Sequence, residues 1–222
     1  MAVASILTEY LLRCASDRLD VFMATREVEF WYEFASTYSY PASMRADRLA
    51  AQAGVKLVWK PFLLGPIFAE QGWNDSPFNI YPAKGANMWR DLKRICDAEG
   101  LKLTLPPHSF PQNALKAARL AIFGERSGWT PEFSRLVYRA NFAEQKDISD
   151  EKVLRGILAA LNLDADAAMA AAETPEIKSR LRRQSEEAKA RGIFGAPSFT
   201  VGDELFWGND RLNEALAWAK RG

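Results

Sequence analysis

A strand–helix–strand pattern near the start of the chain constrains the fold more than any other feature. Residues 28–34 place large apolar side chains at every second position, which is the alternation of a half-buried strand. A helix is expected over residues 41–53, because Pro41 suits the first turn of a helix and Gly54 ends it. Residues 55–62 alternate again and predict a second strand. A short helical connection between two strands favours a parallel pair.

The rest of the chain divides into a helical stretch and a second sheet-forming stretch. Residues 64–75 are expected to be irregular, and a mostly helical region is predicted over residues 81–191. Residues 198–201 and 205–208 predict two strands, and residues 211–220 predict a final helix. This is the element order of a thioredoxin-like α/β fold with a large α-helical insertion between its strand–helix–strand and strand–strand–helix halves.

The element order also suggests a division of the chain. Residues 27–75 and 192–222 are expected to form a thioredoxin-like domain, and residues 76–191 an inserted helical domain. Residues 1–26 are an N-terminal extension. Either they contain an additional helix, or the assigned start is wrong and the protein begins at Met23. The apolar stripe of such a helix would contain Ile6, Tyr10, Leu11 and Cys14.

Composition argues against several classes of function. The 29 Lys and Arg residues are matched by 28 Asp and Glu, so the chain lacks the basic excess of a nucleic-acid-binding protein. No apolar run reaches the roughly 18 residues that a membrane span needs. With only Cys14, Cys96 and His108, the chain offers no cluster for a metal ion and no Cys-x-x-Cys pair. Scarce cysteine favours a reducing compartment, and we expect a cytoplasmic protein.

Ser36 lies where the first predicted strand gives way to a helix. Free backbone N–H groups and the helix dipole make such a position favourable for an anion. Ser36-Thr-Tyr-Ser39 occupies the place of the Cys-x-x-Cys motif in redox thioredoxin folds, and serine cannot carry out disulfide exchange. Ser36 could instead donate a hydrogen bond to a thiolate that a ligand brings. The alternative is that Ser36 only caps the helix, and the serine alone favours neither reading.

A second candidate is the Ala196-Pro197 bond just before the third strand. X–Pro bonds are seldom cis, but a proline at this point of a thioredoxin fold suggests a cis bond. The N–H and C=O of Ala196 would then be free to pair with an extended peptide, as another strand would. The alternative is an ordinary trans proline at the start of a strand.

A third candidate is the segment Trp207-Gly-Asn-Asp-Arg211. Asn209 and Asp210 are expected to begin the final helix, whose N–H groups can hold a carboxylate, and Asp210 can pair with an ammonium group. Together these groups suit a zwitterionic amino-acid head such as the γ-glutamyl end of glutathione. The alternative, a plain Asn/Asp helix cap, is favoured for such a motif in isolation.

Taken together, the motifs resemble the family of 2-hydroxychromene-2-carboxylate isomerases and kappa-class glutathione transferases, which is related to bacterial disulfide oxidoreductases. The resemblance runs from Glu27 to the C-terminus, and the Trp-Gly-Asn-Asp-Arg form is more similar to the isomerases. Thr37 departs from the family pattern, which has proline after the serine. The segments that carry the resemblance are Ser36-Thr-Tyr-Ser-Tyr40, Phe110-Pro-Gln-Asn113, Phe194-Gly-Ala-Pro197 and Trp207-Gly-Asn-Asp-Arg211.

The resemblance implies a role for each candidate residue. Ser36 would be catalytic and would hold the sulfur of glutathione as a thiolate. The implied cofactor-binding residues are Ala196, Trp207, Gly208, Asn209, Asp210 and Asn74, and the implied substrate-binding residues are Lys84, Asn113 and Tyr38. Considered without the resemblance, Lys84 and Asn74 could equally be ordinary exposed residues.

The resemblance implies a glutathione-dependent isomerase that acts on a conjugated intermediate of aromatic catabolism. The thiolate would add to a conjugated carbonyl substrate, and rotation and elimination would release the isomer and unchanged glutathione. A kappa-like transferase or peroxidase is the first alternative, and it would consume glutathione. A non-catalytic thioredoxin-like binding module is the second. The partner in the leading hypothesis is a small aromatic molecule, and a homodimer is possible.

Overall fold

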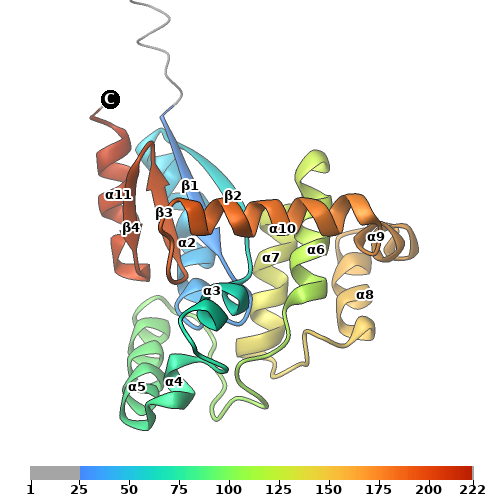
Figure 1. Ribbon diagram of the computed structural model, residues 1–222, viewed down its shortest axis with the longest axis horizontal. Coiled ribbons are helices and arrows are strands. Elements are labelled where there is room, and N and C mark those ends of the chain that lie inside the picture. Colours follow the sequence, from blue (N-terminus) through green and yellow to red (C-terminus); the bar gives the residue numbers. More distant parts are fainter. Residues whose placement is uncertain (1–25, 222) are drawn as a thin grey trace, which may run out of the picture.

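The computed structural model describes residues 26–221, which form a four-stranded mixed sheet surrounded by helices (Figure 1). β1 (Glu27–Tyr32) and β2 (Lys56–Pro61) run parallel, whereas β3 (Ser198–Val201) is antiparallel to β1 and β4 (Glu204–Trp207) is antiparallel to β3. The strand order is β2-β1-β3-β4. The two predicted halves therefore meet in one sheet, which confirms the thioredoxin-like fold.

Aromatic side chains keep the central strands in register. Phe30 of β1 lies opposite Trp59 of β2 and Phe199 of β3, and its ring centroid is 4.9 Å and 5.2 Å from theirs. All three rings are buried. Because successive strand residues face opposite sides of the sheet, a slip of one residue would move Phe30 out of this cluster, and the apolar alternation therefore specifies the pairing.

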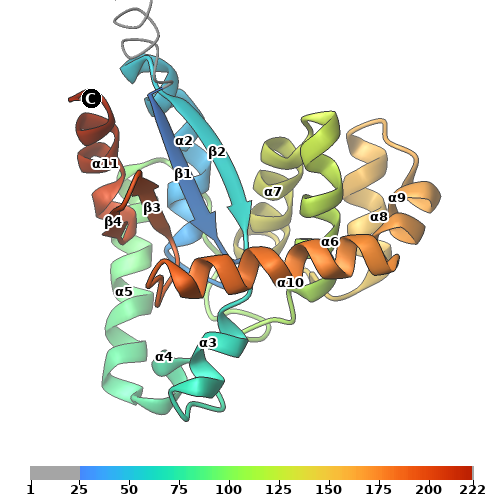
Figure 2. The same ribbon diagram turned by 45° about the horizontal axis from the view of Figure 1, so that its top comes forward.

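Helices cover both faces of the sheet (Figure 2). α2 (Ser39–Ala53) and α11 (Leu212–Ala219) pack on one face, in the larger hydrophobic cluster. α3 (Leu64–Glu70) and the C-terminal end of α10 (Pro175–Ala190) contribute to a second cluster around Trp31 on the other face. The sheet is thus sandwiched between helices from both halves of the chain, and this arrangement fixes the ends of its strands.

Between β2 and β3 the described chain contains helices and no strand, as predicted. Two of the helices begin at residues whose side chains cap them. Asp150 accepts a hydrogen bond from the Lys152 N–H at 2.9 Å, and Thr174 accepts one from the Ile177 N–H at 3.4 Å. The remaining elements of the region are α4 (Pro77–Ile80), α5 (Pro82–Ala98), α6 (Leu115–Gly124), the 3₁₀ turn η1 (Glu125–Ser127), α7 (Thr130–Tyr138), the π-helical turn η2 (Arg139–Ala143), α8 (Glu151–Ala160) and α9 (Ala165–Ala172).

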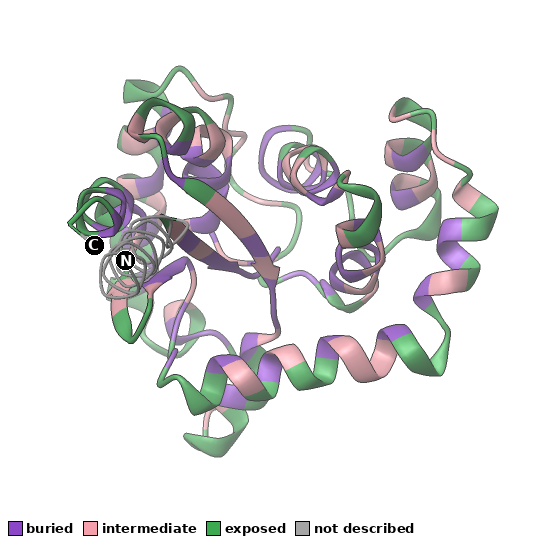
Figure 3. Cartoon of the chain, turned by 90° about the horizontal axis from the view of Figure 1, so that it is seen from above, coloured by how far each residue is buried: buried purple, intermediate pink, exposed green. Residues whose placement is uncertain are grey.

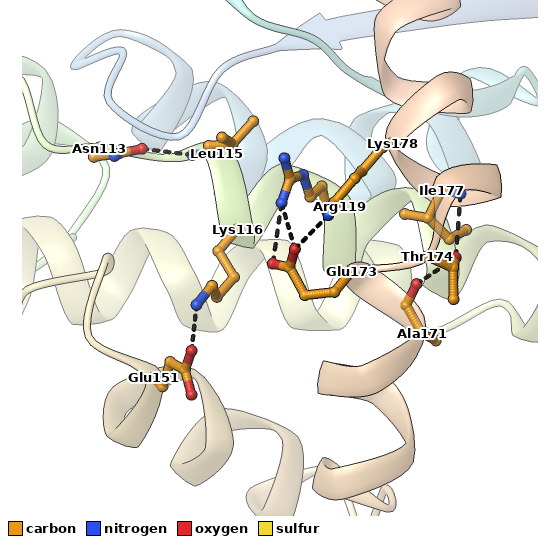
Figure 4. Close-up of polar contacts among 10 residues, drawn as sticks. All are labelled: Asn113, Leu115, Lys116, Arg119, Glu151, Ala171, Glu173, Thr174, Ile177 and Lys178. Atoms are coloured by element: carbon orange, nitrogen blue, oxygen red, sulfur yellow. Dashed lines mark hydrogen bonds and ion pairs between the residues drawn. The ribbon is translucent and has the colours of Figure 1, made fainter.

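Ion pairs join α6 to the helices that follow it (Figure 4). Arg119 Nη1 lies 3.0 Å from each carboxylate oxygen of Glu173, and Glu173 also pairs with Lys178 at 2.8 Å. Lys116 pairs with Glu151 at the start of α8. These contacts are partly exposed, so they orient the helices while the buried side chains supply most of the stabilisation.

The structure corrects the predicted boundaries in several places. Residues 64–75 are not irregular throughout, because α3 forms over their first half. Leu64 and Ile67 of this helix are buried against Trp31, and Pro66 is tolerated because it lies in the first turn, where its missing N–H costs no hydrogen bond. The helical region also starts earlier than residue 81, with α4. The first strand ends at Tyr32, because Glu33 begins the loop that leads to α2.

Some predictions lie outside the described residues. The possible N-terminal helix, its stripe of Ile6, Tyr10, Leu11 and Cys14, and a start at Met23 all belong to that part of the chain. Within residues 26–221, no helix combines the length and the apolar character that crossing a membrane would require.

Candidate functional site

Ser36 lies in the loop between β1 and α2, half-buried, and its hydroxyl bridges two distant parts of the chain. The Ser36 N–H donates to the carbonyl of Glu33 at 3.0 Å, which closes the turn after the strand. The hydroxyl oxygen receives a long hydrogen bond of 3.4 Å from the Ser39 N–H. The hydroxyl itself donates to the carbonyl of Ala196 at 2.7 Å. Ser36 therefore does more than cap α2, because it joins the loop to the segment before β3.

Two donors without an acceptor follow Ser36 in the chain. Within residues 26–221, the N–H groups of Thr37 and Tyr38 have no hydrogen-bond acceptor, and the cap residue of α2 makes no side-chain cap bond. These groups lie at the positive end of a 15-residue helix. With the Ser36 hydroxyl they make a donor set suited to a small anion such as a thiolate.

The Ala196–Pro197 peptide bond is cis, as the fold context suggested. Only half of the predicted pairing site is open, however. The Ala196 carbonyl already accepts the Ser36 hydroxyl, while its N–H has no acceptor in the described part of the chain. A ligand that takes the hydroxyl of Ser36 would release this carbonyl, so the two groups are chemically linked.

The loop after β4 packs directly against the cis-proline segment. The Gly208 N–H donates to the carbonyl of Pro197 at 3.0 Å. Gly208 has a φ of 122°, which residues other than glycine rarely adopt. The ring of Trp207 lies against Gly195 and against Phe194, with ring centroids 4.9 Å apart. Trp207 is 53% exposed, so part of this residue remains accessible to a ligand.

Asn209 does not cap the final helix, contrary to the prediction. It is buried in a 3₁₀ turn, η3 (Asn209–Arg211), and α11 begins after it without a side-chain cap. Its side-chain oxygen accepts a hydrogen bond of 2.9 Å from Arg45 of α2, and its carbonyl accepts one of 2.5 Å from the same nitrogen. The charged donor outcompetes the weaker cap bond, and Asn209 thereby fixes the loop.

Asp210, in contrast, projects into solvent. Its side chain is 76% exposed, and within residues 26–221 it forms an ion pair only with Arg211, at 3.5 Å. The carboxylate therefore remains accessible to an ammonium group. Its negative charge also contributes to the raised pKa of Tyr38, after burial and the hydrogen bond to Asp91.

Tyr38 and Lys84 lie at the side of the site formed by α4 and α5. The Tyr38 hydroxyl donates to Asp91 at 3.0 Å, and its ring is 6.2 Å from that of Phe78. The Lys84 ammonium lies 5.8 Å from the centroid of the same Phe78 ring. Phe78 therefore connects the two predicted substrate-binding residues.

Two predicted residues form no hydrogen bond to this cluster in the described chain. Asn74 is exposed in the loop between α3 and α4, and its side chain makes no hydrogen bond there. Asn113 is exposed before α6, where its oxygen accepts the Leu115 N–H at 3.0 Å (Figure 4). Their roles stay predictions.

The sequence reasoning missed a set of buried polar residues behind the Ser36 loop. The Tyr138 hydroxyl donates to the Glu33 carbonyl at 2.9 Å, and Asn141, in the π-helical turn η2, donates to the Phe34 carbonyl at 3.1 Å. The carboxyl group of Glu33 is buried as well, and burial raises its pKa to about 8. Glu33 stands at a polar position of the predicted strand, and only the fold reveals that it is covered. Arg45, on α2, was missed because its partner is 164 residues away.

Comparison with known proteins identifies the family. The DSBA-like thioredoxin domain matches residues 27–217. The chain belongs to this family. It is 30% identical to the 2-hydroxychromene-2-carboxylate isomerase of Sphingobium xenophagum over 191 residues, which are 85% of this chain and 95% of the relative. It is 26% identical to human glutathione S-transferase kappa 1 over 211 residues, covering 86% of this chain and 89% of the relative.

A solved structure of a 2-hydroxychromene-2-carboxylate isomerase superposes with a TM-score of 0.79 and 23% identity, and covers 88% of this chain and 95% of its own. This likeness confirms the fold. The relatives place the chain among the enzymes of the isomerase and kappa-transferase family.

Proposed function

We propose that this family member is a glutathione-dependent isomerase of a conjugated, aromatic-derived substrate. The observation that carries the proposal is the junction of Ser36 and Ala196, which brings a hydroxyl donor, unpaired N–H groups and the cis-proline segment together. The similarity to an isomerase over most of both chains supports the same reading.

The residues present fit glutathione. The Ser36 hydroxyl and the N–H groups of Thr37 and Tyr38 would hold its sulfur as a thiolate. The unpaired N–H of Ala196 would pair with its peptide backbone. The exposed carboxylate of Asp210 would bind its ammonium group, next to Trp207 and the buried Asn209, and Asn74 is the further residue that we propose contacts it.

When bound, glutathione supplies a nucleophilic thiolate that can add reversibly to a conjugated double bond. The protein contributes position and electrostatics. Donors at the start of α2 keep the sulfur charged without a base, because they stabilise the anion over the thiol. We propose that Tyr38, Lys84 and Asn113 contact the substrate, and the Lys84 ammonium suits an anionic group on it.

Calorimetric titration with reduced glutathione tests the binding site. Asp210→Ala should weaken binding about tenfold, which corresponds to ~1.4 kcal/mol. Asp203→Ala, which changes an exposed aspartate in the turn between β3 and β4, is the matched control and should bind like the wild type. Equal affinity of all three proteins would exclude the role of Asp210, and a wild type without affinity would favour a non-catalytic binding module.

An activity assay then separates isomerase from transferase. An isomerase returns glutathione unchanged, so its concentration stays constant while a 2-hydroxychromene-type substrate is converted. Ser36→Ala should keep the fold and lose on the order of 10²-fold in turnover, because one preorganised donor to the developing charge is removed. The similarity to human glutathione S-transferase kappa 1 makes a transferase or peroxidase the second candidate, and consumption of glutathione would identify it.

A further inference from the structure

Glu33 carries a buried carboxyl group next to the loop that holds Ser36. Glu33 is only 9% exposed. Its Oε2 accepts a hydrogen bond of 2.9 Å from the Ala35 N–H, and its backbone carbonyl accepts the Ser36 N–H at 3.0 Å. The side chain and the backbone carbonyl of Glu33 are therefore both bound to the loop, the first at Ala35 and the second at Ser36.

Uncharged groups lie around Glu33. The Tyr138 hydroxyl of α7 donates to the Glu33 carbonyl, and the Tyr32 ring of β1 lies 6.2 Å from the Tyr138 ring. Burial raises the pKa values of both phenols, so they stay neutral. Thr37 and Ser39 follow in the chain, and their buried hydroxyl groups have no hydrogen-bond partner among the described residues. No Lys, Arg or His in residues 26–221 forms an ion pair with Glu33.

A buried carboxylate without a cation is strongly disfavoured against the neutral acid. Here the effect raises the pKa of Glu33 to about 8, despite the backbone hydrogen bonds that oppose it. Near neutral pH the loop is therefore held by an uncharged acid whose oxygen still accepts the Ala35 N–H. The Glu33 Oε2 accepts the N–H of the residue directly before Ser36, so a negative charge there would lie close to the proposed thiolate site.

We propose that Glu33 is a positioning residue which must be uncharged for a thiolate to bind at Ser36, so that Glu33 ionisation and thiolate binding exclude each other. The proposal rests on glutathione binding, as argued above. The Glu33 Oε2 lies 2.9 Å from the backbone nitrogen of Ala35, the neighbour of Ser36, and two like charges in a partly desolvated site repel each other. Glu33 is thus not the base that deprotonates the thiol, since it already holds its proton, and the proton of the thiol leaves to solvent.

The test compares two ligands and three proteins across pH. Dissociation constants are measured from pH 6.5 to 9 for glutathione and for S-methylglutathione, which has no ionisable thiol. The proteins are the wild type, Glu33→Gln, and Glu27→Gln as a conservative control at the far end of the same strand. Gln keeps the acceptor for the Ala35 N–H and cannot ionise.

At pH 7 the wild type and Glu33→Gln should bind glutathione alike. At pH 9 the wild type should bind it about tenfold more weakly than Glu33→Gln, since most of the wild-type Glu33 is then ionised. This difference at pH 9 should not appear with S-methylglutathione, and Glu27→Gln should follow the wild type. If Glu33→Gln fails to fold, the wild-type profile alone carries the test. Above pH 8 the wild type should bind glutathione more weakly than the rising fraction of glutathione thiolate alone would give, and its affinity for S-methylglutathione should show no such loss.

Parallel profiles for wild type and Glu33→Gln with glutathione would overturn the proposal and leave the proposed function standing. So would a wild-type profile that follows the thiolate fraction up to pH 9. A wild type that binds neither ligand at any pH would instead overturn the proposed function, and the coupling with it.

Discussion

Single side chains hold the site in place through bonds that cross the molecule. Arg45 of α2 is 14% exposed in its side chain, and one of its nitrogens bonds both oxygens of Asn209. Its other terminal nitrogen lies 3.4 Å from Glu99 after α5. Arg45 thus ties the loop that carries Asp210 to the helix that begins beside Ser36, although we assign it no contact with a ligand.

Arg45→Ala should therefore weaken both stability and glutathione binding. Loss of charged hydrogen bonds to a buried Asn209 should lower the free energy of unfolding by about 2 kcal/mol. Arg48→Ala, at an exposed position of the same helix, is the control and should change it by less than about 0.5 kcal/mol. Urea unfolding gives the first quantity and calorimetry the affinity. An Arg45→Ala protein as stable as Arg48→Ala would contradict this account of the loop.

Because the pKa of Glu33 is raised in the folded protein, the free energy of unfolding should depend on pH. The folded protein retains this proton up to about pH 8, while the unfolded chain releases it near the usual value of 4.5. Between these values the folded state binds more protons, so the free energy of unfolding should fall as pH rises from about 4.5 to 8. Urea unfolding across this range should show a smaller decline in Glu33→Gln. An equal slope in both proteins would indicate that Glu33 titrates normally.

At the scale of elements, the site depends on the hairpin of β3 and β4 approaching the segment before β3. The ring of Trp207 lies so close to Gly195 that a Cβ there would be 2.4 Å from its Nε1. Glycine is therefore required by the neighbouring ring and not by the backbone, since the φ of Gly195 is not in the left-handed region.

Gly195→Ala should displace the Trp207 ring and weaken glutathione binding several-fold. Gly156→Ala provides a matched control, because a Cβ at this interior position of α8 meets nothing within 4 Å. It should stabilise the protein by about 0.5–1 kcal/mol through helix propensity. Tryptophan fluorescence would report the environment of the Trp207 ring in both variants, and calorimetry would give their affinity for glutathione. Unchanged fluorescence and affinity in Gly195→Ala would mean that the contact is not needed.

At the scale of the whole molecule, the helical region and the sheet share a hydrophobic cluster. Phe30 of the sheet, Leu92 of α5, Phe133 of α7 and Leu181 of α10 all belong to it. Seen from above, the buried residues lie where helices face one another and the sheet (Figure 3). The division into residues 27–75 with 192–222 and residues 76–191 follows the order of elements along the chain. We propose that these parts are not separate folding units.

Because the core crosses this division, the two parts should unfold together. Urea unfolding followed by circular dichroism, which reports mainly the helices, should coincide with unfolding followed by tryptophan fluorescence. Two separate transitions would show that residues 76–191 are an independent folding unit.

The sequence by itself determined the alternation of β1 and β2, the caps at Asp150 and Thr174, and the serine in place of a reactive cysteine. Such features depend on residues close together in the chain, so they can be read from local patterns. The tertiary structure decided that Asn209 binds Arg45, that Ser36 bonds Ala196, and that Glu33 is covered. The two bonds join residues 160 or more positions apart. Their energy, like the charge of a buried acid, depends on what the folded chain places around them.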